Sequence, residues 1–483
     1  MSRLIVSFPP IIGTSGSDIV TGQEDNAFPA IGIEVKKNGV INTRRGNDTI
    51  EGSGIGGDDF SQAGTGTGIA NSGIIDGGKG DDTISGTGTG GSQYRDNAPG
   101  TGIFNTEGGY VNGGNGKDFI SGNAGGGQVG RGIYNTQDSH IDGGKGDDTI
   151  SGTGGSYEGT GIGIFNTLGS YINGGEGNDS IFGTGTSSQG DGTGISNDGG
   201  SVICGGKGDD SITGIGRGSR GSGDPVGRTY RAGVGTGISN TQGSYIFGGE
   251  GNDSLSGTGI GGGGDSTPFG DFSANMGIGI SNRGNISQGI GDDFISGTGK
   301  GGIADGTGTS ADGTGIVNSG IINLGDGKDT IIGTGISGGV EAIGIGILNT
   351  DGIIYGGRGS DALTGYGTSV GIQGGTIDGG KGNDYFKARR IDADSNPVSY
   401  QGGAIADVLI KGGHGCDIFD VGYGNATIDG GWGWDKLILP DLKSDYTIMG
   451  NSNNQTIERD GFTLSVLNVE KIVFLGVACS TLC

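Results

Sequence analysis

Aliphatic residues, mostly isoleucine, recur at three positions of a unit that repeats every 30 to 43 residues along most of this chain. One lies in the phrase Gly-Ile-x-Asn, one lies shortly before a pair of glycines, and one follows an aspartate by two residues. Small or polar residues flank each of them, so inward and outward positions alternate as in a half-buried strand. The pattern therefore predicts three short strands in every unit.

Stacking these units gives three ladders of inward aliphatic side chains. We therefore expect an all-β fold, a parallel β-solenoid (β-helix or β-roll-like) of about 14 coils with a roughly triangular section. Coils stacked about 4.8 Å apart would form a rod on the order of 65 Å long.

An asparagine follows the first aliphatic ladder by two residues. It occurs at Asn71, Asn105, Asn135, Asn166, Asn197, Asn240, Asn282, Asn318 and Asn349. Because a side-chain amide both donates and accepts hydrogen bonds, we expect it to bond the neighbouring coil. The alternative is an outward array of asparagines that binds a ligand.

The phrase Gly-Gly-x-Gly-x-Asp-x-(Ile/Leu) precedes the third strand of a coil and places one aspartate per coil in the same phase. Clear copies begin at Gly77, Gly113 and Gly143, and degenerate copies surround Asp48 and Asp293. The aspartates in this phase are Asp18, Asp48, Asp82, Asp118, Asp148, Asp179, Asp210, Asp253, Asp293, Asp329, Asp361, Asp384, Asp417 and Asp435.

Carboxylates and the carbonyls of glycine turns are the oxygen ligands that Ca²⁺ prefers. We therefore expect several Ca²⁺ ions between adjacent coils, held by the aspartates and the turn glycines. The glycines best placed for this are Gly78, Gly80, Gly114, Gly116, Gly144, Gly146, Gly175, Gly177, Gly206, Gly208, Gly249 and Gly251. The alternative is that each aspartate only caps its own turn through a local hydrogen bond.

From Asp18 to Asp435 the phrase resembles the nonapeptide of RTX proteins, the hemolysin-type calcium-binding repeat family. Family repeats follow one another directly, whereas this chain has one phrase per long coil, and only the step from Asp417 to Asp435 equals two nonapeptides. The resemblance implies bound calcium and an extracellular or cell-surface location. It also implies type I secretion through an uncleaved C-terminal signal.

The net charge of −25 excludes nucleic acid as a partner, since such binding rests on phosphate neutralisation. Only 30% of the residues are hydrophobic and 124 are glycine, so the core must be narrow. Without a cation the acidic chain repels itself, and we expect folding to be coupled to calcium binding. No long apolar stretch occurs, so no membrane span is predicted.

Three segments are expected along the chain. Residues 1–30 carry prolines and little pattern and would form an N-terminal cap, and residues 31–437 hold the repeats. Residues 438–483 have few glycines and resemble the β cap that follows the last RTX repeat, ending in the secretion segment. The tail cysteines Cys479 and Cys483 are either disulfide-bonded or free.

The longest insertions, residues 215–236 and 258–278, follow the third strand and so leave the coil at one corner. The first of them gathers four arginines: Arg217, Arg220, Arg228 and Arg231. These arginines are either solvated or contact an acidic subunit or a polysaccharide.

We do not expect an enzyme. The chain has two histidines, His140 and His414, at unrelated repeat positions, and the zinc-protease signature HExxH is absent. The expected function is that of a secreted, calcium-stabilised structural protein of a bacterial surface layer, sheath or extracellular fibre, which self-associates. The alternatives are a monomeric RTX-type adhesin or glycan-binding module that contacts cell-surface polysaccharide, and, less favoured, a polysaccharide-modifying enzyme.

Overall fold

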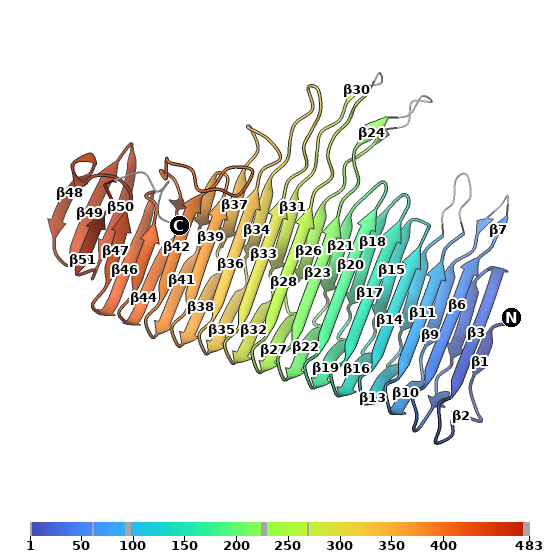
Figure 1. The fold of residues 1–483 in the computed structure, drawn as a ribbon. Helices are drawn as coiled ribbons and strands as arrows, with labels where there is room; N and C mark the ends of the chain where they lie inside the picture. Colours follow the sequence, from blue (N-terminus) through green and yellow to red (C-terminus); the bar gives the residue numbers. More distant parts are fainter. Residues whose placement is uncertain (1, 60–61, 92–97, 224–228, 268–269, 477–483) are drawn as a thin grey trace.

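The coils stack into a long parallel β-solenoid in the computed structural model, which describes residues 2–59, 62–91, 98–223, 229–267 and 270–476 (Figure 1). The solenoid has about 14 turns, so the predicted all-β solenoid is confirmed. No helix in this described part of the chain is long and apolar enough to cross a bilayer.

Three sheets run along the rod, with 13 strands in sheet A, 17 in sheet B and 15 in sheet C. One coil contributes β9 (Gly66–Asn71) to sheet A, β10 (Ile74–Lys79) to sheet B and β11 (Thr83–Thr89) to sheet C. Sheet C carries on through β14 (Phe119–Gly125), β17 (Thr149–Ser156), β20 (Ser180–Ser187), β23 (Ser211–Arg217), β28 (Ser254–Ile260), β33 (Phe294–Lys300), β36 (Thr330–Ile336), β39 (Ala362–Gly367), β42 (Tyr385–Arg390), β45 (Ile418–Val421) and β47 (Lys436–Leu439). The three strands predicted for each coil are therefore the three walls of the solenoid.

The aliphatic ladders form the core. Ile69 pairs in register with Ile103 in sheet A, and Ile84 pairs with Ile120 in sheet C. These side chains are at most 1% exposed. Burying each one fully stabilises the fold by roughly 1.5–3 kcal/mol, so a core one coil wide holds the rod together.

The asparagine ladder is internal. From Asn71 to Asn349, each side-chain Nδ2 donates to the Oδ1 of the next asparagine at 2.8–2.9 Å. The asparagines are at most 1% exposed, so the outward ligand-binding array is excluded. The predicted bonding between coils is confirmed.

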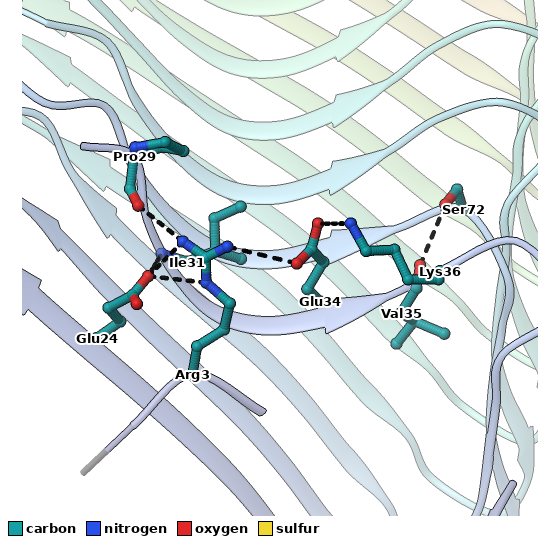
Figure 2. A network of polar contacts seen from close by, with 8 residues as sticks. All are labelled: Arg3, Glu24, Pro29, Ile31, Glu34, Val35, Lys36 and Ser72. Atoms are coloured by element: carbon teal, nitrogen blue, oxygen red, sulfur yellow. Dashed lines mark hydrogen bonds and ion pairs between the residues drawn. The ribbon is translucent and has the colours of Figure 1, made fainter. Parts of the chain in front are cut away.

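The N-terminal segment, expected to form a cap, supplies the end strand of each sheet. The strands β1 (Leu4–Val6), β2 (Ile11–Ile12) and β3 (Ile19–Ala27) pair in parallel with β4 (Ala30–Val35), β5 (Val40–Asn42) and β6 (Thr49–Gly56). Arg3 joins this coil to the next, because its guanidinium donates to Glu24 Oε2 at 2.6 Å and to the Pro29 carbonyl at 2.7 Å (Figure 2). The same guanidinium also reaches Glu34 at 3.5 Å, so one cation orders three groups at the end of the rod (Figure 2).

The C-terminal segment changes strand direction. After the short 3₁₀ helix η1 (Lys443–Asp445), the strands β48 (Thr447–Asn451), β49 (Asn454–Arg459) and β50 (Phe462–Leu467) run antiparallel. β50 pairs in parallel with β46 (Ala426–Gly433), and β51 (Lys471–Phe474) pairs with β47. The cysteines of the tail, Cys479 and Cys483, lie outside the described residues.

The insertions project together from the corner between sheets C and A, as expected (Figure 1). Arg220 lies in one of them and donates to Asp265 of the next insertion at 2.6 Å. It also pairs with Asp305 of the following coil at 3.1 Å. This arginine therefore bridges neighbouring insertions of its own chain, while Arg228 lies outside the described residues.

Candidate metal-binding column

The repeated phrase forms the turn between sheets B and C. In the turn that joins β10 to β11, the glycines at the second and fourth positions of the phrase have positive φ, +103° at Gly78 and +123° at Gly80. Residues with a side chain rarely adopt this conformation, which explains why glycine recurs there. All twelve glycines predicted at these two positions have positive φ.

The predicted aspartates lie at the end of this turn and point inward. Thirteen of them, from Asp48 to Asp435, are at most 5% exposed and stack as one column along the rod. Asp18, in the first coil, is partly exposed. The structure therefore brings all the predicted aspartates into a single line, with one carboxylate per coil.

One oxygen of each carboxylate joins two coils. The backbone N–H of each aspartate donates to Oδ1 of the aspartate in the next coil at 2.7–2.9 Å, from Asp18 to Asp435. The alternative of a local cap is therefore wrong for the buried column. It holds only at Asp18, whose Oδ2 accepts the Thr14 backbone N–H at 2.6 Å.

The other oxygen of each carboxylate has no donor. Oδ2 is buried without a hydrogen-bond partner in all thirteen aspartates from Asp48 to Asp435. An ionised oxygen that is buried and unpartnered is costly, because water no longer solvates it. A proton or a cation bound at each Oδ2 would therefore stabilise the folded chain.

Burial raises the pKa of the twelve column carboxyls from Asp82 to Asp435. Desolvation is the largest cause, the backbone hydrogen bond to Oδ1 opposes it, and neighbouring carboxylates add to the rise in most coils. The pKa rises to about 7 at Asp82, Asp148, Asp210, Asp253, Asp329 and Asp384, and to about 6 at Asp118, Asp179, Asp361 and Asp417. Near neutral pH these ten carboxyls therefore lie close to their titration points.

A second oxygen lies near each unpartnered Oδ2. A methyl group on Gly77, the first glycine of its turn, would lie 2.7 Å from Asp82 Oδ2 and 2.4 Å from the Gly113 carbonyl oxygen of the next coil. Two oxygens from adjacent coils thus converge beside a residue that has no side chain. Both are hard donors of the kind that Ca²⁺ takes, so the donor chemistry fits this ion.

The carboxylates do not gather into a cage. Within the described ranges, no three His, Cys, Asp or Glu side chains come together in a way that could hold a metal ion. A cation in the column would therefore take one carboxylate oxygen per coil and depend on backbone carbonyls for the rest.

Three coils replace the first glycine, and each replacement alters this environment. Thr43 donates its hydroxyl to the Gly77 carbonyl at 2.6 Å, so a hydroxyl occupies that acceptor. Gln288 is buried with neither amide atom partnered, and Leu324 is buried and apolar. The degenerate copies keep Asp48, Asp293 and Asp329 in the column, but a larger side chain replaces the first glycine of each turn.

A glutamate ends the column, and the sequence analysis did not identify it as a site residue. The Asp435 N–H donates to Glu470 Oε2 at 2.7 Å. The signal lies in the alignment of Glu470-Lys471 with Asp435-Lys436, because Lys436 and Lys471 pair in register. It is a weak signal, since the glycine phrase is missing before Glu470.

No protein-family model and no curated protein matches this chain. The RTX resemblance therefore rests on the repeated phrase and on the C-terminal segment of this sequence, and it stays a prediction.

Proposed function

We propose that this chain is a secreted, calcium-stabilised structural protein of a bacterial surface layer, sheath or extracellular fibre. The observation that carries the proposal is the aspartate column, with thirteen buried carboxylate oxygens that lack a donor. The column accompanies the solenoid from Asp48 to Asp435, so whatever neutralises it acts on the whole rod. Calcium, when bound, would supply the positive charge that these oxygens lack.

The two oxygens of each column carboxylate have different roles: Oδ1 joins adjacent coils, and Oδ2 would bind an ion. In the coil of Asp210, Oδ1 accepts the Asp179 N–H at 2.7 Å and fixes the carboxylate against the preceding coil. Oδ2 is then free for an ion, together with the Gly248 carbonyl oxygen, which faces the same point beside Gly205. Binding would therefore stabilise the stacking of adjacent coils.

The same design supports the proposed location outside the cell. A site with one carboxylate oxygen per coil has few charged ligands, and such calcium sites are weak and need the high calcium of extracellular fluid. Open sheet edges at the two ends of a solenoid also favour end-to-end association. Both features support a fibre or layer subunit.

A calcium titration of the metal-free chain, followed by circular dichroism and light scattering, tests the proposal. The expected result is a transition from disorder to β structure with growth of large particles, and magnesium should not replace calcium. The same transition with monomer-sized scattering would favour an adhesin over a fibre subunit. Full β structure in a chelator at neutral pH, unchanged by calcium, would overturn the role of the metal.

A matched pair of variants separates the column from charge in general. Asp210→Asn keeps an acceptor for the Asp179 N–H and places an amide donor near the Gly248 carbonyl. In chelator at neutral pH it should be more stable than the parent chain by about 1 kcal/mol or more, and it should gain less from calcium. Asp209→Asn makes the same charge change at an exposed site and should respond to calcium like the parent.

A further inference from the structure

The outer face of sheet B carries a trench along the axis of the rod, in two stretches that are separated at the coil of Gly289. Its floor is made by the second glycine of successive turns, which has no side chain because the turn requires positive φ. One stretch, with a volume of about 1190 Å³, runs over six coils from Gly78 to Gly249. A second stretch of about 650 Å³ runs over Gly325, Gly357 and Gly380.

Polar side chains form one wall of the trench. Asp76 accepts hydrogen bonds from the amides of Asn42 at 2.7 Å and Asn112 at 2.9 Å, from the coils on either side. Asn173 donates in the same way to Asp142 at 3.0 Å. This alternation of amide and carboxylate presents donors and acceptors together at the spacing of the coils.

The trench is less acidic than the chain as a whole. Arg44, Arg45 and Lys79 line its N-terminal end, and none of them belongs to an ion pair among the described residues. A chain with a net charge of −25 thus exposes unpaired basic groups beside this groove.

Exposed aromatic rings continue the other wall at the C-terminal end. Lys381, His414 and Trp432 occupy equivalent positions in three successive coils. Trp432 is 76% exposed and stacks on His414 with ring centroids 6.0 Å apart. Trp434, the other tryptophan of the chain, is 64% exposed in the same turn. Large exposed aromatic surfaces mark binding sites, because their hydration is unfavourable.

We propose that this trench binds a linear polysaccharide that lies along the axis of the solenoid. Paired amides and carboxylates suit the vicinal hydroxyls of sugars, and Trp432 offers a flat surface for the C–H face of a pyranose ring. A coil rise of about 4.8 Å is close to the length of one sugar in an extended chain, so each coil can present the same contacts to successive sugars. The proposal goes beyond the structural role, and its contacts lie on the outer face of sheet B and not in the aspartate column.

A polysaccharide fits this surface better than other polymers do. A bound peptide would add to the open edge of a sheet, whereas this trench lies on a sheet face whose backbone groups already pair within the sheet. Nucleic acid would be repelled by the acidic chain.

Affinity electrophoresis of the full chain with two soluble polymers, hydroxyethyl cellulose and polygalacturonate, tests the proposal. The variant Trp432→Ala should lose up to about tenfold in affinity, as the loss of one stacking contact predicts. Tyr157→Ala removes an aromatic ring that is 56% exposed outside the trench and should bind like the parent chain. Circular dichroism of each variant checks that the solenoid is intact.

The two polymers separate neutral from acidic recognition. If the ligand carries carboxylates, Arg44→Glu combined with Lys79→Glu should weaken polygalacturonate binding and leave the neutral polymer unaffected. The absence of binding to either polymer, or equal binding by the parent and all trench variants, would overturn the proposal. Because the folded state is monitored separately, this failure is distinguishable from the failure of calcium to stabilise the column.

Discussion

Two ladders of polar side chains run inside this rod. One is built from asparagine amides and the other from aspartate carboxylates, so an amide NH₂ group in the first stands where the second has an oxygen. In the asparagine ladder, Asn197 accepts from Asn166 at 2.9 Å and donates to Asn240 at 2.9 Å and to the Tyr245 carbonyl at 2.9 Å. In the aspartate ladder, Oδ1 is equally well bonded, but Oδ2 has no partner. The amide ladder is neutral and complete, whereas the carboxylate ladder is incomplete.

The difference teaches what stacking alone requires. Coils stack at the asparagine corner without any charge, so a column of buried carboxylates is not needed merely to pair neighbouring coils. A carboxylate in place of an amide brings desolvation and mutual repulsion, which raise the pKa of the column. We infer that the buried aspartates bind a proton or a cation from the solution.

The largest expected effect follows from titrating the whole column in chelator. The folded pKa is about 6 or 7 at ten aspartates, above the unfolded value near 3.8, so the folded chain binds more protons between those limits. Stability is therefore greatest at about pH 4 and falls as pH rises to about 7, by up to about 1.4 kcal/mol per pH unit for each group.

Thermal unfolding followed by circular dichroism across this pH range, with and without calcium, checks the effect. Calcium should flatten the curve by restoring stability at neutral pH. A metal-free chain whose melting temperature rises steadily from about pH 4 to about pH 7 would contradict the assigned direction of the pKa shifts.

An intermediate effect is expected when the asparagine ladder is made to resemble its neighbour. Asn197→Asp removes the donor to Asn240 and to the Tyr245 carbonyl, and it places a buried charge among acceptor oxygens. We expect a loss of about 3 to 5 kcal/mol at neutral pH, partly recovered in acid. Denaturant unfolding measures it, and Asn115→Asp at an exposed position is the control. Equal stability of the two variants would show that the ladder bonds are dispensable.

The smallest effect is expected at the end of the aspartate ladder. Glu470→Ala removes the acceptor of the Asp435 N–H and should cost about 1 kcal/mol, confined to the last coils. Glu470→Gln keeps an acceptor and should behave like the parent chain. Hydrogen exchange at the Asp435 amide reports the difference, and unchanged protection in the alanine variant would remove Glu470 from the ladder.

Much of the architecture follows from periodicity. The aliphatic positions predict the three sheets, because a side chain that alternates in and out along a strand has only one face to bury. The Asn phrase likewise predicts bonding between coils, since an amide both donates and accepts. The twelve turn glycines were predicted from the same phrase, and all have positive φ.

Other features depend on the pairing of neighbouring coils and not on the local sequence. The first coil, formed by β1, β2 and β3, carries little of the repeat, and only its pairing with β4, β5 and β6 places it in the rod. Glu470 joins the aspartate ladder through register, without the glycine phrase. The bridge from Arg220 to Asp265 and Asp305 links residues in separate insertions, whose lengths do not predict that they stack.

The sequence by itself determined the number of walls, the line of aspartates and the glycine turns, because each is a local pattern repeated at every coil. Only the tertiary structure decided where the two carboxylate oxygens point. Oδ1 accepts a hydrogen bond from a backbone N–H of the preceding coil, as Asp82 Oδ1 does from the Asp48 N–H. Oδ2 of Asp82 has no hydrogen-bond partner. The trench beside Trp432 was decided in the same way, since it exists only where successive turns stack. Both depend on contacts between residues far apart in the chain. These contacts form only when the coils stack, so the repeated sequence alone does not show them.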